Sequence, residues 1–155
     1  MTIGGTGTMP NVEGKREAMT AKTEPTGATP CRILVVDDDQ VDRMAVSRHL
    51  RGVSSAIEVK EAEGVFEAIE LITTGAFDCV FLDFNLPDGD GLTFLRGLRM
   101  AGLDVPVVML TGQSDPAVAV DLVSAGAADY IAKAALSPER LMEALAPLRL
   151  TCLAG

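Results

Sequence analysis

Near-continuous apolar runs alternate along this chain with segments in which apolar residues recur every three or four positions. The runs are typical of strands covered on both faces of a parallel sheet, and the longer period is typical of amphipathic helices. Apolar runs predict buried strands at residues 32–36, 78–82 and 105–110. Residues 57–61 alternate between apolar and charged side chains, which favours an edge strand, and residues 130–132 are the weakest candidate strand.

Five helical segments lie between and after these strands, and their apolar positions begin at Val41, Val65, Leu92, Val118 and Leu141. Asp115-Pro116 and Ser137-Pro138 each place a capping side chain before a proline at the first helical position. Gly75 and Gly126 follow helices. Five βα units of about 25 residues predict an α/β fold. The expected fold is a doubly wound, five-stranded parallel sheet with five helices on its two faces, in three αβα layers.

Residues 1–30 have no apolar period and contain five Gly, three Pro and seven Thr, so we expect a disordered N-terminal tail. The folded domain is expected at residues 31–149, with residues 150–155 as a short C-terminal tail. The charges of the first 30 residues cancel, so the net charge of −9 belongs to the remainder. An acidic chain with 4% aromatic residues is poorly suited to nucleic acid or anionic lipid, and its apolar runs are far shorter than a membrane span. We therefore expect no nucleic-acid and no membrane partner.

The three cysteines indicate a reducing compartment. Cys31, Cys79 and Cys152 form no C-x-x-C pair, and their odd number leaves one over. A domain of this length buries enough surface to need neither disulfides nor a structural metal. We expect a cytoplasmic protein.

Polar side chains stand where the predicted strands end. They are Asp37 and Asp38 after the first strand, Asp83 after the third, Thr111 after the fourth and Lys133 after the fifth. Because ligands of open α/β sheets bind beyond the carboxyl ends of the strands, these side chains are expected to meet in one crevice. Glu61 ends the edge strand and is expected to lie to one side.

Each carboxylate could instead cap the next helix. Capping is the preferred interpretation for Asp39, and for Asp37 and Asp38 taken alone it stays an equal alternative. Asp83 is different because Phe84-Asn85-Leu86-Pro87 follows it and no helix begins there. A carboxylate that ends an apolar strand is costly unless it is paired or solvated.

Three carboxylates held close together would repel one another and raise their pKa values. A hard divalent cation removes that conflict, and few carboxylates with room for water suit Mg²⁺ better than Ca²⁺. Asp83 could then stay ionised and act as a nucleophile toward a phosphoryl group. The Lys133 amine and the Thr111 hydroxyl could take the other phosphoryl oxygens.

Four motifs in order resemble the response-regulator receiver domains of two-component signalling, over residues 31–148. The motifs are Ile33-Leu34-Val35-Val36-Asp37-Asp38-Asp39, Val80-Phe81-Leu82-Asp83-Phe84-Asn85-Leu86-Pro87-Asp88-Gly89-Asp90-Gly91, Val107-Val108-Met109-Leu110-Thr111-Gly112 and Gly126-Ala127-Ala128-Asp129-Tyr130-Ile131-Ala132-Lys133. The resemblance implies a flavodoxin-like strand order, 2-1-3-4-5. The chain looks like a stand-alone receiver, similar to the chemotaxis-type single-domain regulators.

The resemblance also implies a role for each site residue. Asp83 would be the phospho-acceptor, and Mg²⁺ would be bound by Asp38, Asp83 and the backbone carbonyl of Asn85, with Asp37 acting through water. Thr111 and Tyr130 would be the switch pair. Side chains at Asn85 and Gln113 would tune the lifetime of the phosphoryl group.

The partners that the resemblance implies are proteins. A histidine kinase or phosphotransfer protein would supply the phosphoryl group, and the face made by the fourth helix, fifth strand and fifth helix would contact a downstream protein or form a homodimer. We expect no DNA-binding or enzymatic module after Leu148. We expect no enzyme activity beyond the domain's own phosphorylation and dephosphorylation.

One departure from the family pattern concerns the residue after Lys133, which is Ala134 where the family usually has proline. We expect a trans peptide bond there and a rearranged loop to Ser137. Two alternatives stay open: a receiver-like interaction module that works without phosphorylation, and a phosphohydrolase of the haloacid-dehalogenase type. The latter would use Asp37-x-Asp39 as its nucleophile motif and would leave Asp83 unexplained.

Overall fold

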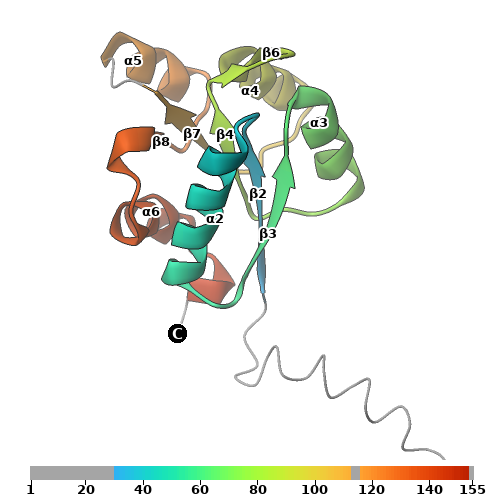
Figure 1. Cartoon of the computed structure of the whole chain (residues 1–155). Coiled ribbons are helices and arrows are strands. Elements are labelled where there is room, and N and C mark those ends of the chain that lie inside the picture. Colours follow the sequence, from blue (N-terminus) through green and yellow to red (C-terminus); the bar gives the residue numbers. More distant parts are fainter. Residues whose placement is uncertain (1–29, 113–115, 154–155) are drawn as a thin grey trace, which may run out of the picture.

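Five parallel strands form the central sheet of the computed structural model, which describes residues 30–112 and 116–153 (Figure 1). The strands are β2 (Cys31–Val36), β3 (Ile57–Ala62), β4 (Cys79–Asp83), β7 (Val107–Thr111) and β8 (Asp129–Ala132). Their order is β3-β2-β4-β7-β8, and every pairing is parallel. The predicted 2-1-3-4-5 order is confirmed.

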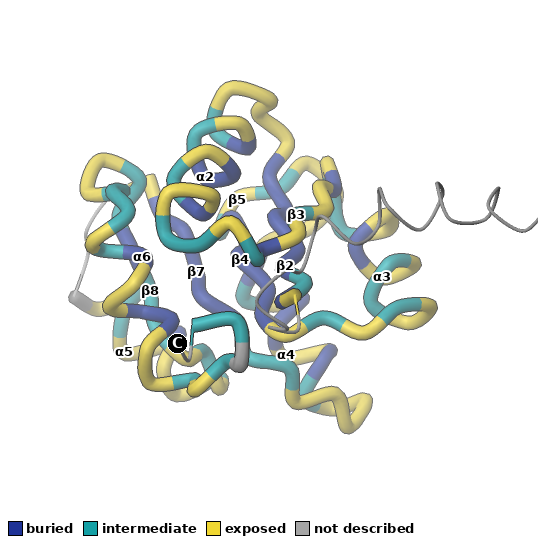
Figure 2. Tube along the Cα trace, turned by 90° about the horizontal axis from the view of Figure 1, so that it is seen from below, coloured by how far each residue is buried: buried dark blue, intermediate teal, exposed yellow. Residues whose placement is uncertain are grey.

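Helices cover both faces of this sheet, as the alternating pattern predicts. They are α2 (Gln40–Val53), α3 (Val65–Thr74), α4 (Gly91–Met100), α5 (Pro116–Ser124) and α6 (Pro138–Leu145). Buried side chains of α2 and α6 pack on one face of the sheet, and those of α3, α4 and α5 pack on the other. The buried trace in Figure 2 follows the strands and the inward sides of the helices. The doubly wound, three-layer α/β fold is therefore confirmed.

The ends of the strands differ slightly from those predicted. β7 begins at Val107 rather than at residue 105, because Pro106 has no N–H to donate to the sheet. In the first four residues of the edge strand β3, buried or half-buried Ile57 and Val59 alternate with exposed Glu58 and Lys60, as the sequence pattern predicts. Asp83 and Thr111 are the last residues of their strands, so the chain direction alone brings them to the same edge of the sheet.

Several short elements were not predicted. A two-residue antiparallel ladder follows Asp83 and joins β5 (Asn85–Leu86) to β6 (Gly89–Asp90). Gly89 has φ of 152°, a conformation that favours glycine. In the described part of the chain, three 3₁₀ helices complete the fold: η1 (Lys133–Ala135), η2 (Ala146–Leu148) and η3 (Thr151–Leu153).

The interpretation of the cysteines as reduced thiols does not match the structure. Cys31 and Cys152 form a disulfide across a sequence separation of 121 residues, and only Cys79 is free. Spacing in the sequence could not reveal this pair, because folding brings together the first strand and the last helical turn. Leu150 and Leu153 also pack against the core, whereas residues 150–155 were expected to be a tail. The boundary at residue 149 stays a prediction.

The first 29 residues lie outside the described part of the chain, so the interpretation of an N-terminal tail stays a prediction. Within the described ranges, the helices are all too short or too polar to cross a bilayer.

Candidate functional site

Three carboxylates converge at the carboxyl edge of the sheet. Asp37 directly follows β2 and is fully buried, Asp83 ends the neighbouring strand β4 and is 5% exposed, and Asp38 is exposed. One oxygen from each of the three lies within 4.8 Å of the others. The convergence expected from the strand ends is therefore present, and it follows from the parallel pairing of β2 with β4.

Lys133 reaches into this cluster from the start of η1. Its Nζ lies 2.8 Å from Oδ2 of Asp37, 2.8 Å from Oδ2 of Asp42 and 3.5 Å from Oδ2 of Asp83. The peptide bond to Ala134 is trans, and the loop turns through η1 before α6 begins. The amine predicted from the sequence thus lies in the site even though proline does not follow it.

The ionisation of Lys133 is fixed by its neighbours. Burial alone would lower the pKa of this amine, but its contacts with Asp37 and Asp42 and the charge of Asp83 outweigh burial and raise the pKa above its usual value. The side chain is therefore a permanent cation at neutral pH, placed between three carboxylates.

The surroundings of the Asp83 carboxyl disfavour its charged form, unlike those of Lys133. Burial first, and then the charge of Asp37, raise its pKa to about 6, although Lys133 and the Asn85 N–H oppose the shift. The Asn85 N–H donates to Oδ1 of Asp83 at 3.3 Å. Without a further cation, this carboxylate is therefore destabilised at neutral pH.

Asp37 has one carboxylate oxygen that is well satisfied and one that is not. Its Oδ1 accepts the Asp39 N–H at 2.9 Å. Its Oδ2 is buried and forms no hydrogen bond in the described part of the chain, so its ion pair with Lys133 is made without hydrogen-bond geometry. A buried oxygen in this state has spare capacity for a ligand. Together with Asp38 and Asp83 it forms a set of hard oxygen donors that suits a divalent cation such as Mg²⁺.

The other candidate residues lie at or near this cluster. Thr111 ends β7 and is buried, and its register partner on β8 is Ala132, the residue before Lys133. Tyr130 is half-buried on β8 and packs against the core on the α3–α4–α5 face. Asn85 is exposed. Gln113 lies outside the described residues, so its role stays a prediction.

Two predicted assignments, for Asp39 and Glu61, are settled by contacts. Asp39 is the N-cap of α2, because its carboxylate accepts the N–H groups of Val41 and Asp42. Glu61 lies outside the cluster and pairs instead with Arg43, whose Nε donates to it at 2.9 Å. Both interpretations are confirmed.

Sequence reasoning missed two residues on the first turns of α2. Asp42 shares Lys133 with the predicted acids, and Arg43 is buried, with one guanidinium nitrogen donating to the Asp37 carbonyl at 2.8 Å. Arg43 therefore ties the loop that carries Asp37 to Glu61 on β3. The signal available in the sequence was weak: an arginine on the apolar side of α2, three residues after the residue that begins the helix.

The loop after Asp83 is held by close backbone approach. A Cβ on Gly91 would lie 2.6 Å from the Asp83 carbonyl oxygen and 2.7 Å from Cε of Met109. The Gly91 N–H donates to the Phe84 carbonyl at 2.7 Å. Only glycine allows α4 to begin so close to the end of β4.

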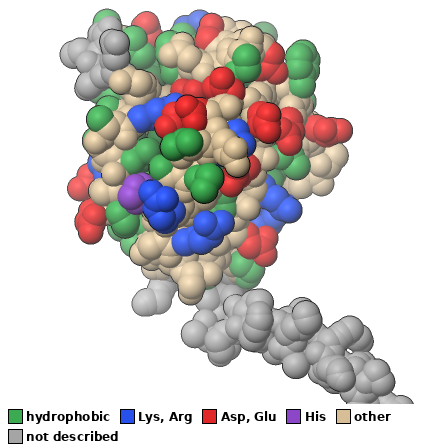
Figure 3. Space-filling view, viewed as in Figure 1, with side chains coloured by type: hydrophobic (Ala, Val, Ile, Leu, Met, Phe, Trp, Pro, Cys, Tyr) green, Lys and Arg blue, Asp and Glu red, His purple; other side chains and the backbone are tan. Residues whose placement is uncertain are grey.

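Acidic side chains also gather outside the cluster of Asp37, Asp38 and Asp83 (Figure 3). In Figure 3 they lie mainly over the upper part of the face, where the strands end, and most Lys and Arg side chains on this face lie lower. The carboxylate cluster therefore attracts cations, and Lys133 is the one cation that contacts Asp37 and Asp83 among the described ion pairs.

Comparison with known proteins identifies this arrangement. The family model described as the response regulator receiver domain matches residues 33–146, most of the chain. The chain belongs to the response-regulator receiver domain family. The alternative of a haloacid-dehalogenase-type phosphohydrolase is set aside by this match.

Relatives of this receiver domain include regulators and isolated receiver domains. It is 40% identical over 120 residues to the response regulator MprA of Mycobacterium sp. (strain KMS), covering 77% of this chain and 50% of that protein. The chain thus spans about half the length of the curated relatives it matches. The signal receiver domain of the NarL regulator of Mycobacterium tuberculosis superposes with a TM-score of 0.69 at 27% identity, covering 77% of this chain and 95% of that one. A Burkholderia pseudomallei response regulator, solved with a phosphorylated aspartic acid, calcium ion and citrate, gives a TM-score of 0.65 at 30% identity, covering 74% and 66%.

Proposed function

We propose that this receiver domain accepts a phosphoryl group on Asp83 from a histidine kinase or phosphotransfer protein, in a reaction that requires Mg²⁺. The observation that carries the proposal is the grouping of three carboxylates within 4.8 Å of one another, with the Lys133 amine in contact with two of them. Asp83 is the member that ends the central strand β4, and it caps none of the described helices. The phosphorylated aspartic acid reported for the Burkholderia pseudomallei regulator is a precedent for this chemistry on the same fold.

The metal would be held by the acidic side chains. Asp38 and Asp83 would bind Mg²⁺ directly, together with the backbone carbonyl of Asn85, and Asp37 would act through water. The fit rests on the buried Oδ2 of Asp37, which forms no hydrogen bond in the described part of the chain, and on the oxygen-only donor set. When bound, Mg²⁺ supplies positive charge that offsets both the repulsion among the carboxylates and the charge of the phosphoryl oxygens.

The chain's own residues then perform the transfer. A carboxylate oxygen of Asp83 attacks the phosphorus of a phosphohistidine, a P–O bond forms, and the P–N bond breaks with its electron pair leaving on the imidazole nitrogen. The product is an acyl phosphate on Asp83. The Lys133 ammonium, now 3.5 Å from Oδ2 of Asp83, and the Thr111 hydroxyl bind the phosphoryl oxygens as the new group arrives.

Signal output would follow from movement of Thr111 and Tyr130. The hydroxyl moves to the phosphoryl group and the ring turns inward into the space it leaves, which changes the face made by α5, β8 and α6. Val120 and Val123 on α5 are 64% and 60% exposed, so this face already offers apolar contact to a protein partner or to a second copy of the domain. Asn85 and Gln113 would set how long the phosphoryl group survives.

The proposed setting is the cytoplasm. The proposed partners of this domain are proteins rather than nucleic acid, because the chain carries a net charge of −9. The domain catalyses only its own phosphorylation and dephosphorylation. How the whole protein passes on the signal is also part of this proposal, because the chain spans about half the length of its relative MprA.

Phosphorylation of the purified chain by acetyl phosphate tests the proposal. Intact mass spectrometry should find one added phosphoryl group in the presence of Mg²⁺, none with a chelator, and none in Asp83→Asn. The matched control is Asp90→Asn, which alters an exposed N-cap carboxylate of α4 and should label like the wild type. Equal labelling of Asp83→Asn and wild type would refute the assignment.

Beryllofluoride separates this function from the alternative of a module that works without phosphorylation. Titration with beryllofluoride and Mg²⁺ should perturb the NMR resonances of residues around Asp83, Thr111 and Tyr130. A spectrum that is unchanged at saturating concentrations would favour the module that works without phosphorylation.

A further inference from the structure

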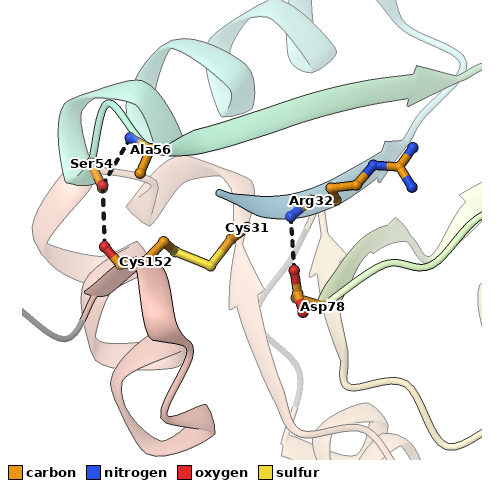
Figure 4. The surroundings of a disulfide bond; sticks show 6 residues. All are labelled: Cys31, Arg32, Ser54, Ala56, Asp78 and Cys152. Atoms are coloured by element: carbon orange, nitrogen blue, oxygen red, sulfur yellow. Dashed lines mark hydrogen bonds between the residues drawn. A yellow bond between two sulfur atoms is a disulfide. The ribbon is translucent and has the colours of Figure 1, made fainter. Parts of the chain in front are cut away.

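The two ends of the folded domain are joined by a covalent bond at the edge of the sheet opposite the carboxylates. Cys31 is the first residue of β2 and is 1% exposed, and Cys152 lies in η3, with their Cα atoms 5.5 Å apart. Figure 4 shows the sulfur–sulfur bond running from the start of β2 to this last helical turn, beside Ser54 and Ala56. The bond therefore joins residues 146–153, here called the C-terminal segment, covalently to the first strand of the core.

Non-covalent contacts of the C-terminal segment are few. Leu148, Leu150, Cys152 and Leu153 are only partly buried against the core on the α2–α6 face. Among the described residues, the hydrogen bond that links η3 to another element is from the Ser54 hydroxyl to the Cys152 carbonyl, at the long distance of 3.5 Å. The remaining hydrogen bonds given for this segment join its first residue to the adjoining helix, from the Ala146 N–H to the Met142 carbonyl, or are internal to it, such as Leu153 N–H to the Leu150 carbonyl. Without the disulfide, partly buried apolar contacts would have to hold the segment.

The third cysteine lies out of disulfide reach of Cys31. Cys79 lies on β4 opposite Ile33, so its Cα is diagonal to that of Cys31 at a distance of about 8 Å by strand geometry, beyond disulfide reach. It is buried, and burial raises the pKa of its thiol to about 12, so it stays protonated and unreactive. The chain thus pairs two cysteines specifically and keeps the third out of exchange.

We propose that Cys31 and Cys152 form a redox-responsive staple that attaches the C-terminal segment to the core under oxidising conditions and releases it on reduction. The proposal rests on the cytoplasmic setting proposed above, because disulfides in that compartment are commonly transient and redox-sensing rather than permanent.

The chemistry is thiol–disulfide exchange with a low-molecular-weight disulfide such as oxidised glutathione. The Cys152 thiolate, on the partly exposed segment, attacks one sulfur of the small disulfide, and one small thiol leaves. The Cys31 sulfur then attacks the Cys152 sulfur of this mixed disulfide and displaces the second small thiol. The two protein thiols lose two electrons and two protons, and the small disulfide is reduced to two thiols.

Redox state and phosphorylation should be separable because the two sites lie at opposite ends of β2. Six residues of extended strand place Cys31 about 20 Å from Asp37. The redox state of the staple is therefore expected to change the stability of the domain and the exposure of the C-terminal segment. Asp83 should still accept phosphate in both redox states.

Equilibration of the full chain in glutathione buffers of graded ratio tests the staple. Free thiols are alkylated, and intact mass spectrometry counts them after denaturation. We expect a two-electron transition from three alkylated thiols to one, with the Cys31–Cys152 peptide link found in the oxidised form. Three free thiols at every ratio, or a link that includes Cys79, would overturn the proposal.

Thermal unfolding and limited proteolysis then measure what the staple does. A cross-link that closes a loop of this length should raise the melting temperature by about 10 °C or more over the reduced form. Trypsin should cleave after the exposed Arg149 faster in the reduced protein. Cys152→Ser should behave like the reduced wild type with or without reductant, and Cys79→Ser should keep the full redox response. Cys152→Ser is the primary variant because Cys31 is in the core.

A melting temperature and an Arg149 cleavage rate that are the same in both redox states would overturn the staple. Acetyl phosphate labelling is measured in the same samples. Loss of labelling together with an intact thiol transition would count against the proposed phospho-acceptor function and would leave the staple supported.

Discussion

Removal of the charge on Asp83 should stabilise the metal-free domain. Burial and the neighbouring Asp37 raise the pKa of this carboxyl from 3.8 to about 6, so the ionised form is disfavoured in the folded state. A shift of about two pKa units corresponds to about 3 kcal/mol. In Asp83→Asn a neutral amide of nearly the same shape replaces the carboxylate, and this penalty disappears.

The effect should depend on pH in a defined direction. Because the folded-state pKa lies above that of the unfolded chain, the folded wild type holds a proton that the unfolded chain has lost between about pH 4 and pH 6. The wild type should therefore lose stability as pH rises through this window and level off above it. Asp83→Asn should exceed the wild type by about 3 kcal/mol at about pH 8 and by about 1 kcal/mol at about pH 4.5.

Urea unfolding in the presence of a chelator measures this difference. The chain has no Trp and one Tyr, so far-ultraviolet circular dichroism is the suitable signal. The disulfide must be kept in one redox state throughout. Asp90→Asn is the control: its side chain still accepts the Thr93 N–H at the start of α4, and its stability should match the wild type at both pH values.

Addition of Mg²⁺ should reverse the order of the two proteins. The cation stabilises the folded wild type in proportion to the logarithm of its concentration over the dissociation constant, and Asp83→Asn has lost one of its proposed ligands. The reasoning fails if Asp83→Asn is no more stable than the wild type without metal at about pH 8, or if the gain is the same at both pH values.

Three further substitutions are checked by the same urea assay. Arg43→Ala should lower the free energy of unfolding by about 2–3 kcal/mol, because it leaves the Asp37 carbonyl and Glu61 without their guanidinium partner. A loss well below about 1 kcal/mol would mean that water replaces the guanidinium at both acceptors. Gly91→Ala should lower it by about 2 kcal/mol, since the new Cβ would lie 2.6 Å from the Asp83 carbonyl oxygen, and wild-type stability would refute that clash. Gly97→Ala should raise it by up to about 1 kcal/mol, because Gly97 is inside α4, lines a cavity of about 390 Å³ and has no atom within 4 Å of the added Cβ; a decrease would contradict this.

The sequence was sufficient for the layers of the fold and for most of the candidate site. Short apolar runs that alternate with amphipathic helical segments are typical of a parallel sheet, and parallel strands bring their carboxyl ends to one edge. Asp37, Asp83 and Lys133 could therefore be placed together from their positions in the chain alone. Their proposed roles go beyond geometry and await the phosphorylation experiment.

The features that sequence reasoning missed are made by side chains that meet only after folding. Lys133 and Asp42 are 91 residues apart, and the two cysteines of the disulfide are 121 residues apart, so no local spacing reports either contact. Arg43 was missed for a different reason. Its position on the apolar side of α2 is unfavourable for a charge, and only the acceptors that β3 and the Asp37 loop supply make its burial tolerable.

The start of α3 depends on a residue that is not its own neighbour. Gly64, at the N-cap position, has no side chain to accept a hydrogen bond, and the Asp88 carboxylate accepts the Val65 and Phe66 N–H groups instead, at 2.9 and 3.2 Å. Asp88 lies five residues after Asp83, on the same loop. Any displacement of that loop when Asp83 changes its charge would thus be passed directly to the first turn of α3 through these two hydrogen bonds. Phe66 is on that turn and is 76% exposed, so the change at Asp83 would also alter the surface at α3, a second place separate from the face of α5 and β8.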